Sequence, residues 1–122
     1  RLLMPGFLGK PETCVGHFDI FALSSDSEQF PLSLVEAMAA GLPAVSTDVG
    51  DVRAIVSERN RPMIARVDDD MVFGRLLARM IGDPLLRAEI GAANRARVVA
   101  EYDEAVMVER YREVYSRAME TA

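Results

Sequence analysis

The chain has 122 residues, of which 50% are hydrophobic and 27% are charged, and its formal net charge is −5. This balance predicts a packed core in about one domain and argues against disorder. Lys10 is the only lysine and the sequence has no basic cluster, so a nucleic-acid surface has little support.

Cys14 is the only cysteine, which excludes an internal disulfide and fits a reducing cytoplasm. We expect no signal peptide, and no apolar run approaches a membrane span. We therefore expect a cytoplasmic protein, and leave open a peripheral membrane association of the full-length protein. Because the chain starts at Arg1 inside an apolar run, without an initiator Met, we expect it to be a piece of a longer protein.

Short apolar runs alternate with helical stretches in the first half of the chain. The runs are continuous rather than alternating, as in strands buried on both faces of a parallel sheet. The predicted strands are Leu2–Met4, Ile20–Leu23, Ala44–Ser46 and Met63–Ala65. The predicted helices between them are Pro11–Gly16, Pro31–Ala40 and Asp51–Glu58. This order predicts an α/β fold with a Rossmann-like parallel sheet and flanking helices.

The second half of the chain reads as helices alone, namely Asp68–Ile81, Pro84–Glu101 and Glu104–Met119. Asp83 is the expected N-cap of the middle helix, with Pro84 at its first position. Two apolar stripes are expected on the last two helices: Leu86, Ile90 and Ala93, then Val108, Tyr111, Tyr115 and Met119. We divide the chain into a strand–helix part, 1–66, and a C-terminal helical part, 67–122.

The helix after Phe30 has an unusual beginning. Pro31 lacks an N–H, and the amides of Leu32 and Ser33 still need acceptors that Phe30 does not offer. Such a helix start, beyond the carboxyl end of a strand, is suited to an anion. The alternative is that a nearby side chain folds back as a cap, the candidates being Ser25, Asp26 and Ser27.

Two carboxylates bracket this helix start. Glu28 precedes it, and Glu36 lies within the helix on a different stripe from the residues expected to face the sheet, which are Val35, Met38, Ala39 and Leu42. The alternative for both glutamates is an ordinary solvated surface position. Their place beyond the end of a strand favours a ligand, because open α/β sheets bind nucleotides there.

The sequence around these glutamates resembles a known family. Glu28 and Glu36 are separated by seven residues, and the second is followed by Ala37-Met38-Ala39-Ala40-Gly41-Leu42-Pro43. This resembles the E-x7-E motif of retaining GT-B glycosyltransferases of family four (glycosyl transferases group 1). Flanking segments also resemble that family: Asp19 to Ser25, Ala44 to Thr47, Val49-Gly50 and Asp83 to Tyr115.

The resemblance implies a hexosyltransferase-like enzyme that takes its sugar from a nucleotide-diphosphate sugar, with no separate cofactor and no metal. It implies that Glu36 holds the ribose hydroxyls and that Glu28, the expected catalytic residue, contacts the donor sugar. Leu32 and Ser33 would hold the diphosphate through their amides, and Phe30 and Pro31 complete the donor-binding set. By this reading the ligand caps the helix.

The resemblance also implies missing parts. The family often has Glu-Gly-Phe-Gly-Leu where this chain has Glu28-Gln29-Phe30-Pro31-Leu32, so Pro31 removes one amide and Gln29 adds a side chain. The diphosphate clamp and the acceptor-binding N-terminal domain would lie upstream of Leu2. We therefore expect the truncated C-terminal half of a GT-B enzyme, inactive alone, with an unidentified acceptor.

Other residues suggest weaker hypotheses. His17 has no Cys/His companion, so a structural or surface role is favoured. The acidic run Asp68–Asp70 suits a helix start better than a metal. Asp48 and Asp51 lie near the expected site, without an assigned role. Two alternative functions remain, a non-catalytic nucleotide-binding module and a structural interaction domain. The exposed stripe of the last helix predicts self-association.

Overall fold

A parallel three-stranded sheet forms the centre of the structure, a computed structural model that describes residues 1–120. Its strands are β1 (Phe21–Leu23), β2 (Ala44–Thr47) and β3 (Ile64–Ala65), in the spatial order β1-β2-β3. The α/β fold is thus confirmed, and three of the four predicted strands are present within a residue or so of their expected ends.

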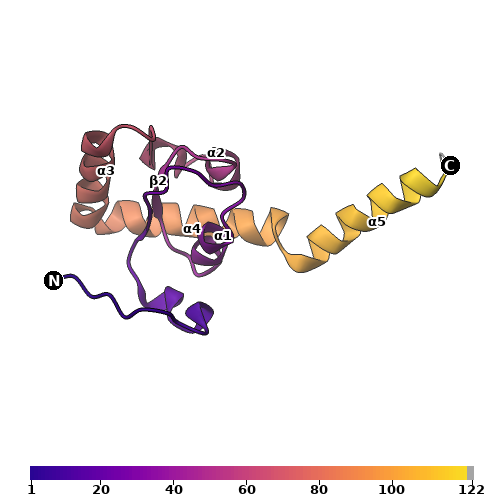
Figure 1. The fold of residues 1–122 in the computed structure, drawn as a ribbon, viewed down its shortest axis with the longest axis horizontal. Helices are drawn as coiled ribbons and strands as arrows, with labels where there is room; N and C mark the ends of the chain where they lie inside the picture. Colours follow the sequence, from indigo (N-terminus) through magenta and orange to yellow (C-terminus); the bar gives the residue numbers. More distant parts are fainter. Residues whose placement is uncertain (121–122) are drawn as a thin grey trace.

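Five α-helices surround or extend this sheet (Figure 1). They are α1 (Leu32–Ala39), α2 (Val52–Ile55), α3 (Asp70–Gly82), α4 (Pro84–Glu101) and α5 (Glu104–Glu120). Among the three short 3₁₀ helices of residues 1–120, η1 (Pro11–Thr13) and η2 (Val15–His17) precede β1, and η3 (Arg61–Met63) lies between α2 and β3. Asp83 caps α4 as predicted, since its carboxylate accepts a 2.9 Å hydrogen bond from the N–H of Leu86.

The two faces of the sheet carry separate apolar cores, as a parallel sheet requires. One core joins β2 to α1, α2 and the end of α4, and consists of Leu34, Met38, Ala44, Val49, Val52, Ile55, Val56, Ile64 and Val98. The other consists of Val45, Met63, Met80 and Ile90, with side chains of α3 packed against them. All four residues of β2 are buried, so this central strand is the most deeply buried of the three.

A buried amide network ties α4 to the amino end of β2. The Asn60 side chain bonds both the N–H and the carbonyl of Ala44, at 2.9 and 2.8 Å. Asn94 donates to the Leu42 carbonyl and to Asn60, and accepts from the hydroxyl and the N–H of Ser57. Both asparagines are fully buried, and every polar atom of these amides has a partner of the right kind.

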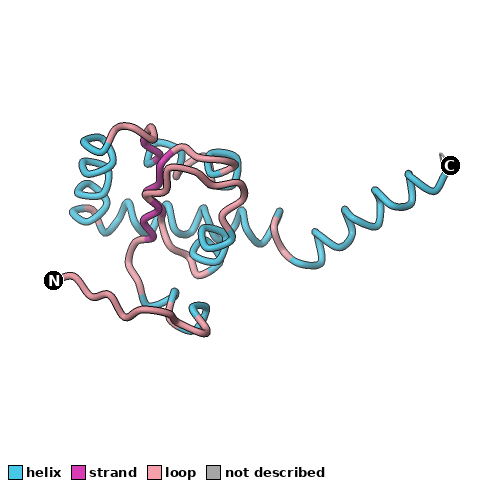
Figure 2. Tube along the Cα trace, viewed as in Figure 1, coloured by secondary structure: helices cyan, strands magenta, loops and turns pink. Residues whose placement is uncertain are grey.

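The predicted strand Leu2–Met4 is wrong. Residues 1–10 are irregular and exposed, with Leu2 at 84% exposure, and Figure 2 shows this segment as a loop leading to the N-terminus. A strand needs a neighbour to satisfy its backbone, and no described strand lies beside this segment. The predicted helix Pro11–Gly16 is likewise replaced by the two short turns η1 and η2.

Some helix limits and faces also differ from the predictions. Helix α1 starts at Leu32 rather than Pro31, α2 ends at Ile55, and α3 starts at Asp70. The buried residues of α1 are Leu34, Ala37 and Met38, with Val35 half-buried and Ala39 exposed. The buried stripe is rotated by one residue because α1 packs against α4 as well as the sheet.

Helix α5 projects away from the rest of the structure (Figure 1) and has no buried residue. Its apolar stripe is exposed as predicted, with Tyr111 at 59% and Met119 at 73% exposure. Within residues 1–120, no helix has both the length and the apolar character needed to cross a bilayer. The last two residues of the predicted C-terminal part, 121–122, lie outside the described residues.

Candidate functional site

The loop after β1 is fastened to the end of β2 and to the turn that follows it. The hydroxyl of Thr47, the last residue of β2, donates a 2.6 Å hydrogen bond to the carbonyl of Ser25. The N–H of Asp51 donates to the carbonyl of Gln29 at 2.8 Å. Because both anchors belong to the same strand and turn, residues 25–29 are held at the carboxyl edge of the sheet.

Gly50 allows the two loops to approach this closely. Its φ is +48°, and a Cβ at this position would stand 2.2 Å from the Gln29 carbonyl oxygen and 2.5 Å from that of Glu28. Only glycine fits such a conformation and such a contact without displacement of the neighbouring backbone. The glycine therefore sets the position of the segment that carries Glu28.

Glu28 is half-buried in this loop, and its carboxylate has a defined partner. The Ser25 hydroxyl donates a 2.7 Å hydrogen bond to Oε1 of Glu28. Ser25 is therefore engaged with the glutamate rather than with the start of α1. The second carboxylate oxygen, Oε2, takes no part in this bond and has its acceptor capacity left.

Helix α1 begins directly after this loop, and no side chain caps it. Pro31 occupies the N-cap position in an extended conformation and has no side-chain cap bond. The capping alternative with Ser25, Asp26 or Ser27 is thus wrong for this structure. Leu32 and Ser33 supply the first two amides of the helix, and both residues are exposed. The helix start, where Pro31 is buried and Leu32 and Ser33 are exposed, has the partial positive charge of an N-terminus.

Glu36 is exposed on the same helix, so the prediction that it is not a core residue is confirmed. It follows Ser33 by three residues and Leu32 by four, and all three residues are exposed. Side chains at this spacing share one face of a helix, and each leans toward the N-terminus. Glu36 therefore lies on the exposed face that leads to the start of α1.

Phe30 lies differently from the rest of the predicted set. Its ring is 5.8 Å from the ring of Tyr102, centroid to centroid, with an angle of 55° between the planes. Together with Leu32, Val35 and Tyr111, these rings line an apolar groove of about 240 Å³ near the junction of α4 and α5. The side chain of Phe30 thus belongs to that groove. Only the backbone of Phe30 borders the loop that carries Glu28.

Asp48 and Asp51 have structural partners at this edge. The carboxylate of Asp48 pairs with Nε of Arg53 at 2.9 Å, and both side chains are partly exposed. Asp51 acts through its backbone, which bonds Gln29 and begins α2. Through these contacts, both aspartates stabilise the turn after β2.

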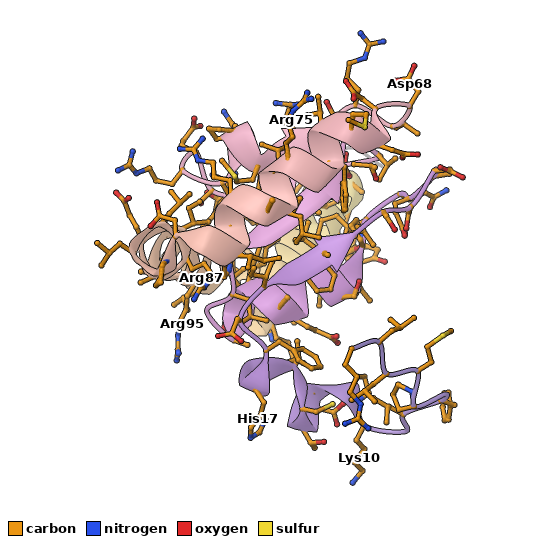
Figure 3. All side chains as sticks on the ribbon, turned by 90° about the vertical axis from the view of Figure 1, so that its left-hand side faces the viewer. Lys10, His17, Asp68, Arg75, Arg87 and Arg95 are labelled. Carbon is orange, nitrogen blue, oxygen red and sulfur yellow. The ribbon has the colours of Figure 1, made fainter. Side chains whose placement is uncertain are left out.

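His17 lies at the other edge of the sheet. It belongs to η2, before the amino end of β1, and lines a separate cavity of about 420 Å³ with Arg87 and Ile81. Figure 3 shows it at the opposite end of the view from Asp68, which follows the carboxyl end of β3. It is exposed, in agreement with the surface role that the sequence favoured.

The acidic run at the start of α3 has a helix-capping role. Asp69 accepts a 2.9 Å hydrogen bond from the N–H of Val72, as an N-cap does. Across residues 1–120, His, Cys, Asp and Glu side chains form no group of three or more suited to a metal ion.

The residues that hold the site in place were not predicted from the sequence. Ser25, Thr47 and the close approach at Gly50 were not predicted in these roles. Thr47 offered one signal, because a hydroxyl residue at the carboxyl end of a buried strand can reach the backbone of the neighbouring loop. The Ser25–Glu28 bond had the i, i+3 spacing of local side-chain contacts, but serine at this spacing has many alternative partners.

Comparison with solved structures identifies the fold. The fold superimposes on sucrose-phosphate synthase from Thermosynechococcus elongatus with a TM-score of 0.77 at 22% identity, covering 85% of this chain and 26% of that one. It superimposes on TarM of S. aureus with a TM-score of 0.72 at 22% identity, covering 93% of this chain and 23% of that one. The chain therefore has the fold of part of a GT-B glycosyltransferase.

The sequence matches the family model of glycosyl transferases group 1 over residues 1–97, and the chain belongs to this family. It is 27% identical over 112 residues to N-acetyl-alpha-D-glucosaminyl L-malate synthase of Bacillus anthracis, covering 89% of this chain and 29% of that protein. The chain thus spans less than a third of the length of each of these three proteins. The match does not favour either of the two alternative functions.

Proposed function

We propose that this chain is the donor-binding C-terminal portion of a retaining glycosyltransferase of family four. The enzyme would transfer a sugar from a nucleotide-diphosphate sugar to an acceptor held by an upstream domain. The observation that carries the proposal is the start of α1, where Leu32 and Ser33 are exposed and no side chain caps the helix, next to the loop that presents Glu28. Family membership supplies the reaction class.

The diphosphate is assigned to the start of α1. The amides of Leu32 and Ser33 would donate to phosphate oxygens, and the Ser33 hydroxyl would add a contact. Charge builds up on the diphosphate as the bond to the sugar breaks, and a helix N-terminus stabilises that charge without rearrangement. TarM, whose fold is similar, was solved in a complex that contains UDP, which supports a nucleoside diphosphate as the ligand.

The two glutamates are assigned to the two ends of the donor. Glu36 would accept from the adjacent ribose hydroxyls, since one carboxylate can accept from both. Glu28 would accept from hydroxyls of the sugar, where an interaction that strengthens in the transition state raises turnover. Phe30 and Pro31 would border the donor through the backbone of the loop. Neither a metal nor a separate cofactor is part of the proposal.

Sugar transfer by the complete protein tests this function. We expect turnover of at least one nucleotide sugar, with the product retaining the donor's anomeric configuration when followed by NMR. Glu28→Gln should lower turnover while the affinity for the bare nucleoside diphosphate stays close to that of the unmodified protein. An inverted product would contradict retention. Equal losses for both ligands would remove Glu28 from the sugar end of the site.

A further inference from the structure

Ser25 lies between the sheet and the carboxylate of Glu28. Its carbonyl accepts the 2.6 Å hydrogen bond from Thr47, whose side chain is nearly buried at the end of β2. Its hydroxyl donates the 2.7 Å hydrogen bond to Oε1 of Glu28. A short series of contacts therefore runs from the buried central strand through the backbone of Ser25 to the glutamate.

This contact fixes a side chain that would otherwise rotate. Glutamate has three flexible side-chain torsions, and an unrestrained carboxylate would have to be ordered when a ligand binds. A hydrogen bond to a charged acceptor is stronger than one between neutral groups, so the Ser25 hydroxyl is an effective restraint. The bond occupies one lone pair of Oε1 and leaves Oε2 available for a ligand hydroxyl.

The backbone of the loop does not depend on the Ser25 hydroxyl. Residues 25–29 are anchored through the carbonyl groups of Ser25 and Gln29, which accept from Thr47 and Asp51. Removal of the Ser25 hydroxyl leaves both of these bonds in place. The effect of that hydroxyl should therefore appear in the orientation of Glu28 rather than in the stability of the fold.

We propose that Ser25 is a positioning residue that holds Glu28 in the orientation in which the carboxylate receives a hydroxyl of the donor sugar. The proposal rests on the function proposed above. It deepens that function by assigning sugar recognition to a pair, Ser25 and Glu28, rather than to Glu28 alone. Ser25 itself does not touch the ligand.

Ser25→Ala in the complete protein tests this role. We expect kcat/KM for the sugar nucleotide to fall about tenfold. The affinity for the bare nucleoside diphosphate should not change, and the melting temperature should shift by no more than about 3 °C. Ser25→Thr keeps a hydroxyl and should recover most of the activity. Ser27→Ala, an exposed serine of the same loop, is the matched control and should have no effect.

A double-mutant cycle separates positioning from a general effect on the loop. In a Glu28→Ala background, Ser25→Ala should cause no further loss, because the side chain that it positions is absent. An equal loss in both backgrounds, or an equal loss of nucleotide and sugar-nucleotide affinity, would overturn the positioning role. Failure of the unmodified complete protein to transfer sugar would instead contradict the proposed function itself.

Discussion

Gly50 and Gln29 are in direct backbone contact, although they lie in different loops. A Cβ at residue 50 would stand 2.2 Å from the carbonyl oxygen of Gln29, and the next residue, Asp51, donates its N–H to that same oxygen. The loop after β1 and the turn after β2 therefore form one unit at the carboxyl edge of the sheet. The proposed donor site is built on this unit.

Gly50→Ala should destabilise the fold and displace the loop that carries Glu28. The side chain would combine an unfavourable positive φ with a clash against backbone, so we expect a loss of at least about 2 kcal/mol in the free energy of unfolding. Urea denaturation measures this free energy of unfolding. Gly74→Ala in α3 is the matched control, since its Cβ would meet no atom within 4 Å. The control should be stabilising by about 0.5–1 kcal/mol. A Gly50 variant as stable as the unmodified chain would contradict the contact.

Asn94→Ala should be among the most destabilising truncations in α4. It would leave the N–H and hydroxyl of Ser57 and the carbonyl of Leu42 without their buried partner. We expect a loss of about 3 kcal/mol in the free energy of unfolding. Arg95→Ala, the exposed neighbour on the same helix, should change it by less than about 0.5 kcal/mol. Equal effects of the two truncations would show that the amide network contributes little.

The order of strands and helices could be predicted because local sequence patterns indicate each element. A continuous apolar run marks the buried strand Ile64–Ala65, and Asp83-Pro84 marks a helix start. The run Leu2–Met4 has the same local pattern, yet it forms no strand within the described residues. Strand formation depends on a partner in space, which an apolar run alone does not reveal.

The glutamates of the candidate site could be selected by spacing, but the groups that hold the loop could not. Thr47 and Ser25 are 22 residues apart, and Asn94 and Asn60 are 34 apart. Such contacts follow from the way the loops and helices meet, and each side chain has many possible partners before the fold is known. The face of α1 was missed for the same reason, since α4 covers part of it.

The 122-residue chain alone should have no transferase activity. The function proposed above assigns the acceptor to an upstream domain, so this chain would bind the donor without presenting an acceptor to it. Incubation with a panel of nucleotide sugars, followed by product detection, measures this. Product formation by the pure chain above the level of a Glu28→Ala control would contradict the proposal that an upstream domain holds the acceptor.

The exposed stripe of α5 should drive self-association of the chain at high concentration. The residues of this stripe are between 37% and 73% exposed, on a helix without buried residues: Val108, Tyr111, Tyr115 and Met119. Exposed apolar surface of this kind favours contact between identical chains. Sedimentation should show dimers or larger species, and Tyr111→Ser with Tyr115→Ser should shift the chain toward monomer. Glu109→Ser with Glu113→Ser is the control on the same helix. A strictly monomeric chain near millimolar concentration would contradict the prediction.

Calorimetric titration with nucleoside diphosphates tests the donor site most directly. UDP, GDP and ADP are titrated into the complete protein, both unmodified and as the variants Glu36→Ala and Glu109→Ala. Glu109→Ala is the control, because it removes another exposed helical glutamate. We expect at least one of these nucleotides to bind, and Glu36→Ala to weaken that binding by about 1–3 kcal/mol through the loss of charged hydrogen bonds. Glu109→Ala should bind as the unmodified protein does, and neither variant should alter the melting temperature appreciably. An affinity unchanged by Glu36→Ala would contradict the assignment of Glu36 to the ribose and, with it, the placement of the donor along α1.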